Sequence, residues 1–161
     1  MHAFFKYLFL VYFVTHVPIT LLIDLQGNWG QHYPQILQDL VAWYITHFKD
    51  FLMDSKPDWF RSFIICEALF QLPFFFSAIY ALVYHKNWIR IPAIVYGAHV
   101  STTLIPILAE FIASSSLSST EKTYLCGIYS PYLLIPALLC LYMCLVPKPF
   151  PDSGSNTKKS K

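Results

Sequence analysis

The sequence predicts an all-α membrane protein, a four-transmembrane-helix bundle with proline-kinked helices and a lumenal amphipathic helix between the first two spans. Three observations lead to this fold class. Of the 161 residues, 56% are hydrophobic and only 12% are charged, about half the charged fraction of a soluble domain. Four apolar stretches have about the 20 residues that a helix needs to cross a bilayer. Each of these stretches contains at least one proline.

The predicted spans cover residues 4–24, 60–85, 91–111 and 123–146, and residues 1–146 are expected to form one membrane domain. Residues 7–23 contain no Asp, Glu, Lys or Arg, and Phe4 and Phe5 extend this stretch toward spanning length. It is expected to be retained, because no Ala-x-Ala cleavage site of a signal peptide follows it. Residues 62–85 contain Glu67 as their only formal charge, and residues 91–109 and 123–147 contain none.

Residues 25–59 form the only long polar segment and are expected to lie on the lumenal side. Apolar residues recur within it at helical spacing, which indicates an amphipathic helix of about five turns. Such a helix is too polar to span and is expected to lie at the membrane interface, covering the end of the bundle. Its apolar face holds Ile36, Leu37, Leu40, Val41, Tyr44, Phe48, Phe51 and Leu52.

The distribution of basic residues predicts that both termini face the cytosol. Seven of the eleven Lys and Arg residues then lie on the cytosolic side and four on the other, in agreement with the usual bias. Residues 147–161 are predicted to form a disordered basic tail. The tail ends in KKSK, so that Lys158 and Lys159 resemble a dilysine retrieval signal of the endoplasmic reticulum. Attraction of the tail to anionic lipids is the alternative.

Neither nucleic acid, a metal nor a cofactor is expected as a partner. The formal net charge of +2 is small, and the basic residues form no stripe. All four cysteines lie inside predicted spans, where cysteine behaves as a small hydrophobic residue. No pattern of His and Cys residues supports a metal site around them.

Asp24 and Glu67 are predicted to lie at nearly the same depth in the bundle. Asp24 ends the first span, and Glu67 lies six residues after Arg61, about 9 Å into the second, antiparallel span. Gln71 follows one turn deeper on the face of Glu67. Ionisable groups within a membrane are costly, by about 2.5–3.5 kcal/mol, and usually face a cavity or a partner. Alternatively, Asp24 caps the first helix and Glu67 bonds only to protein.

Two adjacent carboxylates in a medium of low dielectric constant cannot both ionise easily, so the pair is expected to share a proton. The ionised member would bind a cationic amine, and the protonated member would donate a hydrogen bond. Helices kinked by proline leave gaps that can form a cavity. Aromatic walls with one or two acids favour flat, apolar ligands with an amine or a hydroxyl, such as sterols. The expected wall residues are Phe63, Phe70, Phe74, Tyr129 and Tyr132.

Five segments closely resemble the sigma-2 receptor family, also called the transmembrane protein 97 family. These segments are HVPITLLIDLQ, YPQILQDLVAWYITHFKD, WFRSFIICEALFQLPFF, WIRIPAIVYGAHVSTTLIPIL and YSPYLLIP. They follow the family's order from about Tyr12 to Pro136. The family is grouped with the emopamil-binding sterol isomerases among the EXPERA-domain proteins. The resemblance implies a four-helix bundle of the endoplasmic reticulum membrane, often dimeric, with a pocket open toward the bilayer.

By position, the resemblance implies that Asp24 pairs with ligand amines and that Glu67 is protonated beside it. Gln71 and Tyr132 match positions that line the family's pocket, and Asp50 matches an acid with a structural role. The isomerase relatives carry a His-x-x-x-Glu pair on a helix like the first. In this chain Thr20 stands four residues after His16, which argues against isomerisation.

Three functions are compatible with these features. The first is a non-enzymatic protein of the endoplasmic reticulum that binds sterols or cationic amphiphiles in an intramembrane pocket and serves lipid or sterol handling. The second is a chaperone or quality-control factor there, for precursor proteins in transit to another organelle such as mitochondria. The third is a sterol double-bond isomerase in which Asp24 and Glu67 move protons between carbons. Expected partners are a sterol or other lipid, cationic ligands, client proteins and a second copy of the chain.

Overall fold

The computed structural model describes residues 1–151, and this part of the chain is helical throughout, without a β-strand. Four of its helical stretches are long and apolar enough to cross a membrane: Ala3–His32, Asp58–Val83, Asn87–Ala113 and Ser119–Leu145. The predicted fold class is therefore confirmed. The predicted spans agree with these stretches except at the first, which continues as a helix well beyond residue 24.

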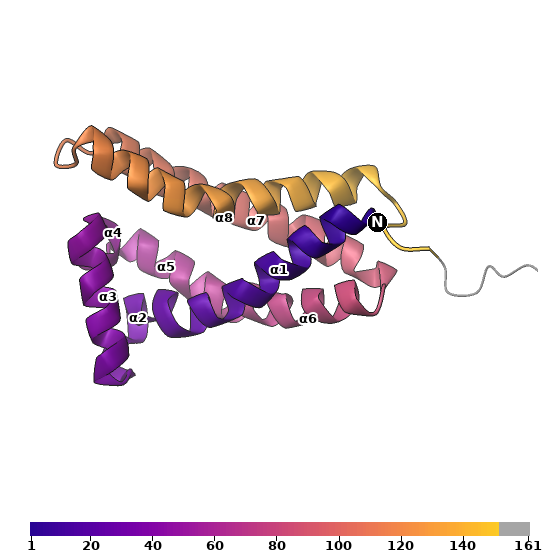
Figure 1. Cartoon of the computed structure of the whole chain (residues 1–161), viewed down its shortest axis with the longest axis horizontal. Coiled ribbons are helices and arrows are strands. Elements are labelled where there is room, and N and C mark those ends of the chain that lie inside the picture. Colours follow the sequence, from indigo (N-terminus) through magenta and orange to yellow (C-terminus); the bar gives the residue numbers. More distant parts are fainter. Residues whose placement is uncertain (152–161) are drawn as a thin grey trace, which may run out of the picture.

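Two helical hairpins form the bundle. In the first hairpin, α1 (Ala3–Ile19) packs against α6 (Leu72–Val83), which continues α5 (Asp58–Cys66). In the second hairpin, α7 (Arg90–Ala113) and α8 (Ser119–Leu145) pack side by side along their length, after the short 3₁₀ turn η4 (Asn87–Ile89). Figure 1 shows α7 and α8 as one layer, with α1, α5 and α6 as the other.

Each helix of the first hairpin contains a π-helical turn. These turns are η1 (Thr20–Asp24) after α1 and η3 (Glu67–Gln71) between α5 and α6, and in each a backbone N–H bonds to a carbonyl five residues earlier. Pro18 lies two residues before η1, and Pro73 two residues after η3. Because proline lacks an N–H and its ring crowds the preceding turn, it disturbs the regular helical bonds nearby. Single π turns inside helices occur frequently at functional sites.

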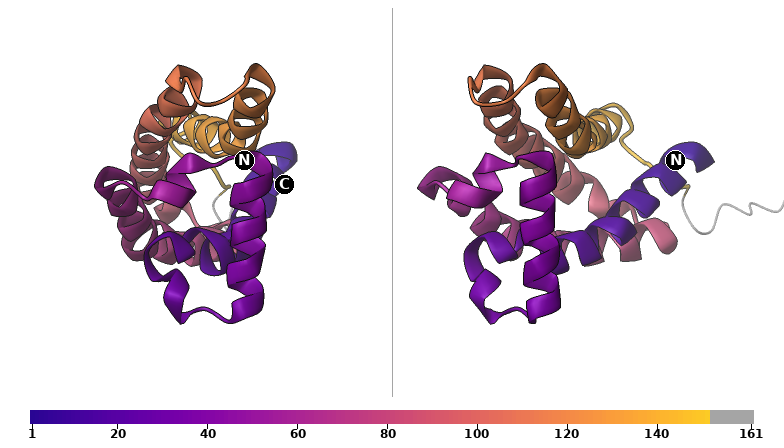
Figure 2. Two further views of the ribbon diagram at one scale, coloured as in Figure 1. Left: turned by 90° about the vertical axis from the view of Figure 1, so that its left-hand side faces the viewer. Right: turned by 60° about the vertical axis from the view of Figure 1, so that its left-hand side comes forward.

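The segment between the first two spans covers one end of the bundle. It comprises α2 (Gln26–Trp29), the 3₁₀ turn η2 (Gly30–His32), α3 (Gln35–Phe48) and α4 (Phe51–Ser55). Figure 2 shows α2, α3 and α4 lying across that end. Val41, Leu52 and Met53 are its buried apolar anchors.

The prediction of one continuous amphipathic helix through Leu52 is wrong. The chain breaks at Lys49, whose φ of 59° is left-handed and ends α3. Asp50 then starts α4, and its carboxylate accepts a hydrogen bond from the backbone N–H of Met53 at 3.1 Å. A short polar side chain at this position satisfies a free N–H of the new helix, so the local sequence favours two helices over one.

The chain after the fourth span folds back onto the turn between α6 and α7. Phe150 is 2% exposed, and its backbone N–H and C=O both bond to the side chain of Asn87 at 2.9 Å. The N-terminal ammonium group donates to the carbonyl oxygen of Pro149, so both ends of the described chain lie at the same end of the bundle (Figure 1). The prediction of disorder is therefore wrong for residues 147–150. Lys158 and Lys159 lie outside the described residues.

A glycine sets the spacing between α7 and α8. A Cβ atom at Gly97 would lie 2.5 Å from the carbonyl oxygen of Pro136 and 2.8 Å from the Cβ of Cys140. Both of these neighbours belong to α8, and the nearest is a backbone atom that cannot rotate away. The two helices can pack this closely only because residue 97 has no side chain.

We expect Gly97→Ala to lower the free energy of unfolding by about 1–3 kcal/mol, because α8 has to move away from α7. Gly127→Ala on α8 is the matched control, since nothing lies within 4 Å of a Cβ atom there. The better helix propensity of alanine should make this control neutral or stabilising by up to about 1 kcal/mol. Thermal unfolding in detergent measures both variants, and equal midpoints for the two would contradict the close approach.

Candidate ligand-binding site

A cavity lies between the two hairpins, at the end that α3 and α4 cover. Its volume is about 170 Å³, measured as the space open to the centre of a water molecule, whereas one water needs about 10–15 Å³ on that measure. The cavity therefore has room for an organic group of many atoms. Its apolar wall consists of Ile19, Ile23, Met53, Phe60, Phe63, Ile64, Val100, Leu104, Ile107 and Ile128.

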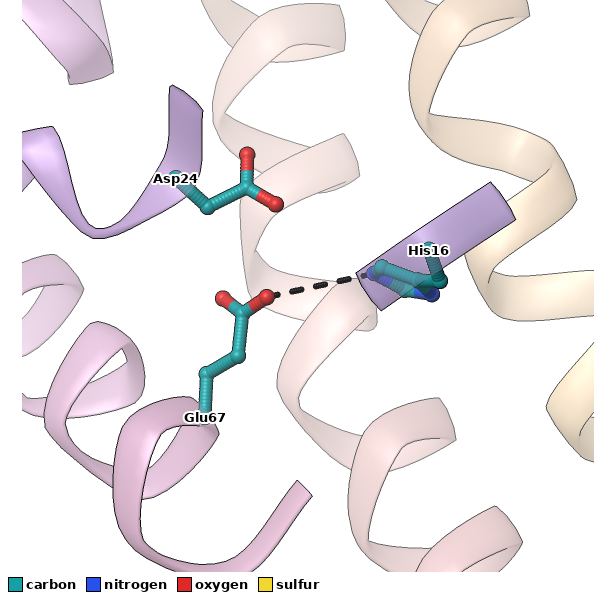
Figure 3. A group of neighbouring side chains, drawn as sticks. All are labelled: His16, Asp24 and Glu67. Carbon is teal, nitrogen blue, oxygen red and sulfur yellow. Dashed lines mark ion pairs between the residues drawn. The ribbon is translucent and has the colours of Figure 1, made fainter. Parts of the chain in front are cut away.

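Asp24 and Glu67 meet at this cavity. Asp24 is the last residue of η1 and Glu67 the first of η3, so both acids project from the π turns of the first hairpin. Figure 3 shows their carboxyl groups close together, and one oxygen of each lies within 4.8 Å of the other. Two ionised carboxylates offer only acceptors, so a direct hydrogen bond between them would require a proton on one of the two groups. The structure thus brings the predicted pair into contact.

His16 and Thr20 complete the cluster, and the sequence analysis did not assign them to the site. The Thr20 hydroxyl is fully buried and donates to Oε1 of Glu67 at 2.5 Å. Nε2 of His16 lies 3.8 Å from the same oxygen, as Figure 3 shows, and His16 is 5% exposed. Thr20 and His16 precede Asp24 by four and eight residues, and this spacing was the sequence signal that could have assigned them to the site. In an α-helix, two residues four apart are rotated slightly past each other around the axis. The π turn has more residues per turn and counteracts this rotation between Thr20 and Asp24.

Gln71 and Tyr132 also line the cavity, where the sequence placed them. Gln71 ends η3 and is buried, one π turn below Glu67. Tyr132 comes from α8, and its ring centre lies 4.7 Å from that of His16. The first hairpin therefore supplies the acids and the amide, and the second hairpin supplies a phenol to the same space.

Two of the five predicted aromatic wall residues were wrong. Phe63, Tyr129 and Tyr132 line the cavity as expected. Phe70 lies within η3 but is 67% exposed on the outside of the bundle. Phe74 does not line the cavity and stacks on Tyr96, with ring centres 4.5 Å apart. The π turn changes which face of the helix each later residue occupies, and α-helical spacing gives no sign of that change.

Asp50 lies beside the cavity, but its bonds are all to the protein. It is fully buried and accepts hydrogen bonds from the hydroxyls of Tyr44 at 2.9 Å and Tyr129 at 2.7 Å, besides that from Met53. Burial and the charge of Asp50 raise the pKa of Tyr44, so this phenol keeps its proton and remains a donor. Since Tyr129 belongs to α8, Asp50 joins the covering segment to the second hairpin.

The acidic cluster also has the donor atoms of a metal site. One nitrogen or oxygen from each of His16, Asp24 and Glu67 lies within 4.8 Å of the other two, the only such group of three in residues 1–151. One His and two carboxylates can bind zinc. The surrounding wall of the cavity is mostly apolar. The arrangement therefore suits an organic cation with an apolar body better than a bare ion.

Residues 36–143 match the EXPERA (EXPanded EBP superfamily) family. This match includes Asp50, Glu67, Gln71 and Tyr132, and the segment with Asp24 precedes it. The matched part of the chain is well over half of its length and contains the second and third candidate spans and nearly all of the fourth.

The chain is also similar to curated proteins over most of its length. It is 48% identical over 153 residues to sigma intracellular receptor 2 of Xenopus tropicalis, covering 89% of this chain and 90% of that protein. It is 42% identical over 150 residues to the protein of the same name in Homo sapiens, covering 85% of each chain. It is 33% identical over 156 residues to efficient mitochondria targeting-associated protein 19 of Saccharomyces cerevisiae, covering 82% of this chain and 92% of that one.

We expect Asp50→Ala to lower the free energy of unfolding by about 3 kcal/mol, because two phenols and a backbone N–H lose their acceptor. Asp39→Ala is the control, since Asp39 is an exposed acid of α3 that bonds only to Gln35 on its own helix, at 2.8 Å. Its loss should change stability by less than about 0.5 kcal/mol. Thermal unfolding in detergent compares the two variants. Similar midpoints would show that Asp50 does not hold the covering segment in place.

Proposed function

The chain belongs to the EXPERA family, and on that premise we propose that it is a non-enzymatic membrane protein that binds sterols or cationic amphiphiles in the cavity at Asp24 and Glu67. Its role would be in lipid or sterol handling. The observation that carries the proposal is a pair of adjacent carboxyl groups in a cavity whose other walls are mostly apolar. The relatives from Xenopus tropicalis and Homo sapiens, which are named receptors, support ligand binding as the activity.

The shared proton would decide which ligands the pair accepts. With one proton between them, the two carboxyl groups carry one negative charge, which can bind one ammonium group. The same pair contains a donor and several acceptors, so it can also bond to the hydroxyl of an uncharged sterol. The Thr20 hydroxyl already donates to one oxygen of Glu67. The apolar wall would then cover the body of the ligand.

The position of the titratable groups supports binding over isomerisation. Moving a double bond requires an acid and a base on opposite sides of the migrating bond. Here the donor and acceptor atoms of His16, Asp24 and Glu67 gather within 4.8 Å of one another. The absence of a glutamate four residues after His16 weighs little against isomerisation, because Glu67 reaches the imidazole from the neighbouring helix. The clustering of His16, Asp24 and Glu67 weighs more strongly against it.

We place the protein in the endoplasmic reticulum membrane with both termini in the cytosol. The distribution of seven against four basic residues supports this orientation. The contact between the N-terminus and Pro149 supports a common side for both ends of the described chain, which is also what four spans predict.

We expect Asp24→Asn to weaken binding of a radiolabelled cationic amphiphile by about 10–100-fold, because a charged hydrogen bond is lost while the shape of the side chain is kept. An uncharged ligand of similar shape should lose less affinity. Asp39→Asn, an exposed acid outside the cavity, is the control and should bind both ligands normally. Unchanged affinity of Asp24→Asn for the cation in membranes would eliminate the charge role.

A second candidate function is assistance to precursor proteins in transit to another organelle. The observation that favours it is the 33% identity to a yeast protein named for efficient mitochondria targeting. A helix is about 10–12 Å across, so the cavity as it stands admits single side chains of a client and not a whole helix. A basic side chain inserted between Asp24 and Glu67 would be the expected contact.

Photocrosslinking from the cavity wall separates the two functions. A photoreactive phenylalanine analogue at Phe63 samples the cavity, and the same analogue at Phe70 samples the outside of the bundle. Ligand binding predicts sterol or lipid adducts at residue 63 that a cationic amphiphile displaces, with adducts at residue 70 unaffected. Displaceable polypeptide adducts at residue 63 would favour the precursor function instead.

A further inference from the structure

A second hollow lies outside the ligand cavity, within the segment that covers the bundle. It is formed by α2, η2, α3 and the chain from the end of α4 into α5, and its volume on the same measure is about 560 Å³. Its polar lining consists of Gln26, Asn28, Gln31, Gln38, Ser55, Lys56 and Arg61. The hollow is thus rich in hydrogen-bond donors, whereas the ligand cavity is mostly apolar and acidic.

The charge of this hollow is positive and uncompensated. No Asp or Glu lines it. Within residues 1–151, neither Lys56 nor Arg61 has a carboxylate at ion-pair distance, and Lys56 has no hydrogen bond to another side chain. Asp54 and Asp58 flank Lys56 in the sequence, but both are exposed and neither lines the hollow. Two cations without a counter-ion form a site for an anion.

The guanidinium group of Arg61 is held in place for such a contact. Its Nε donates to Oδ1 of Asn28 at 3.0 Å, and Nδ2 of Asn28 donates to the carbonyl oxygen of Arg61 at 2.9 Å. This reciprocal pair fixes the side chain across α2 and α5 and leaves the two terminal nitrogens of the guanidinium group for a ligand. A fixed, planar donor set of this kind matches the oxygens of phosphate.

The hollow lies at the level of lipid headgroups. Lys56 comes two residues before the second candidate span, and Arg61 lies in the first turn of that span. Trp29, at the end of α2, is 39% exposed and Trp43, on α3, is 56% exposed. Exposed tryptophans next to span ends mark the membrane–water interface. Figure 2 shows α2 and α3 on this same end of the bundle.

We propose that this hollow binds a phosphate-bearing anion, namely the headgroup of an anionic phospholipid, through Lys56 and Arg61. A basic residue near the membrane surface contributes roughly a five-fold gain in affinity for anionic lipid. Two such residues therefore favour a headgroup with net negative charge over phosphatidylcholine, whose phosphate is already neutralised by its own choline. The hollow is separate from the acidic pair, so this site does not depend on what the ligand cavity binds.

The chain offers a matched pair of variants for the test. Lys49 and Lys56 both lie in the covering segment and both have left-handed φ, 59° and 49°. Lys49 is exposed and does not line the hollow. Lys56→Gln and Lys49→Gln therefore remove the same charge from the same backbone conformation, one inside the site and one outside it. Both variants should unfold at the temperature of the parent protein.

Native mass spectrometry of the full chain in detergent measures the result, with phosphatidylglycerol and phosphatidylcholine titrated separately. We expect phosphatidylglycerol to bind more tightly, with about five-fold weaker binding in Lys56→Gln and no change in Lys49→Gln. Lys56→Gln combined with Arg61→Gln should weaken it further, by about 25-fold. Binding of phosphatidylcholine should stay the same in every variant.

Inorganic phosphate distinguishes the two sources of the anion. If millimolar phosphate fails to displace phosphatidylglycerol, the lipid headgroup is the occupant. If it displaces the lipid from the parent protein but not from Lys56→Gln, the phosphate site stands and its occupant is a soluble phosphate. Equal binding of phosphatidylglycerol to Lys49→Gln and Lys56→Gln, or no preference over phosphatidylcholine, would overturn the proposal.

Discussion

The close approach of the carboxyl groups of Asp24 and Glu67 is the constraint on which the rest of the structure depends. Two carboxyl groups inside a membrane are tolerated only if protonation lowers their total charge and their oxygens find further hydrogen bonds. The structure supplies Glu67 with a hydrogen bond from the Thr20 hydroxyl and with the nearby imidazole of His16. Both acids project from π turns, and a proline lies near each turn. The irregular backbone of the first hairpin thus serves to bring the two groups together.

A third acid, Asp50, has a structural role. Asp50 is fully buried, and its oxygens accept hydrogen bonds from two phenols and a backbone N–H. These bonds satisfy the carboxylate without a ligand. One of these phenols, on Tyr129, comes from the second hairpin. Asp50 therefore fastens the covering segment over the cavity. Neighbouring carboxylates differ in role because their hydrogen-bond partners differ.

The segment between the first two spans separates two sites of opposite charge. On the bundle side, Tyr44 and Met53 complete the wall of the acidic cavity. On the interface side, Lys56 and Arg61 line the basic hollow. A cationic amphiphile and an anionic lipid would thus be bound within one small structure without competing for the same groups. Relatives with different names are similar to this chain over most of its length, so the charges of the two sites carry more functional information than the family alone.

The sequence by itself determined the four spans, from their hydropathy, and the similar depth of Asp24 and Glu67, from the rise per residue of a helix. Both quantities depend only on the order of residues along the chain. Lateral contact depends on how each helix is rotated and bent, which only the tertiary structure decided. The π turn at Glu67 sent Phe70 outward, and the approach of a neighbouring helix gave His16 its carboxylate. The burial of Asp50 and of Phe150 likewise required partners distant in sequence, Tyr129 for Asp50 and Asn87 for Phe150. Such pairings leave no periodic trace in the chain.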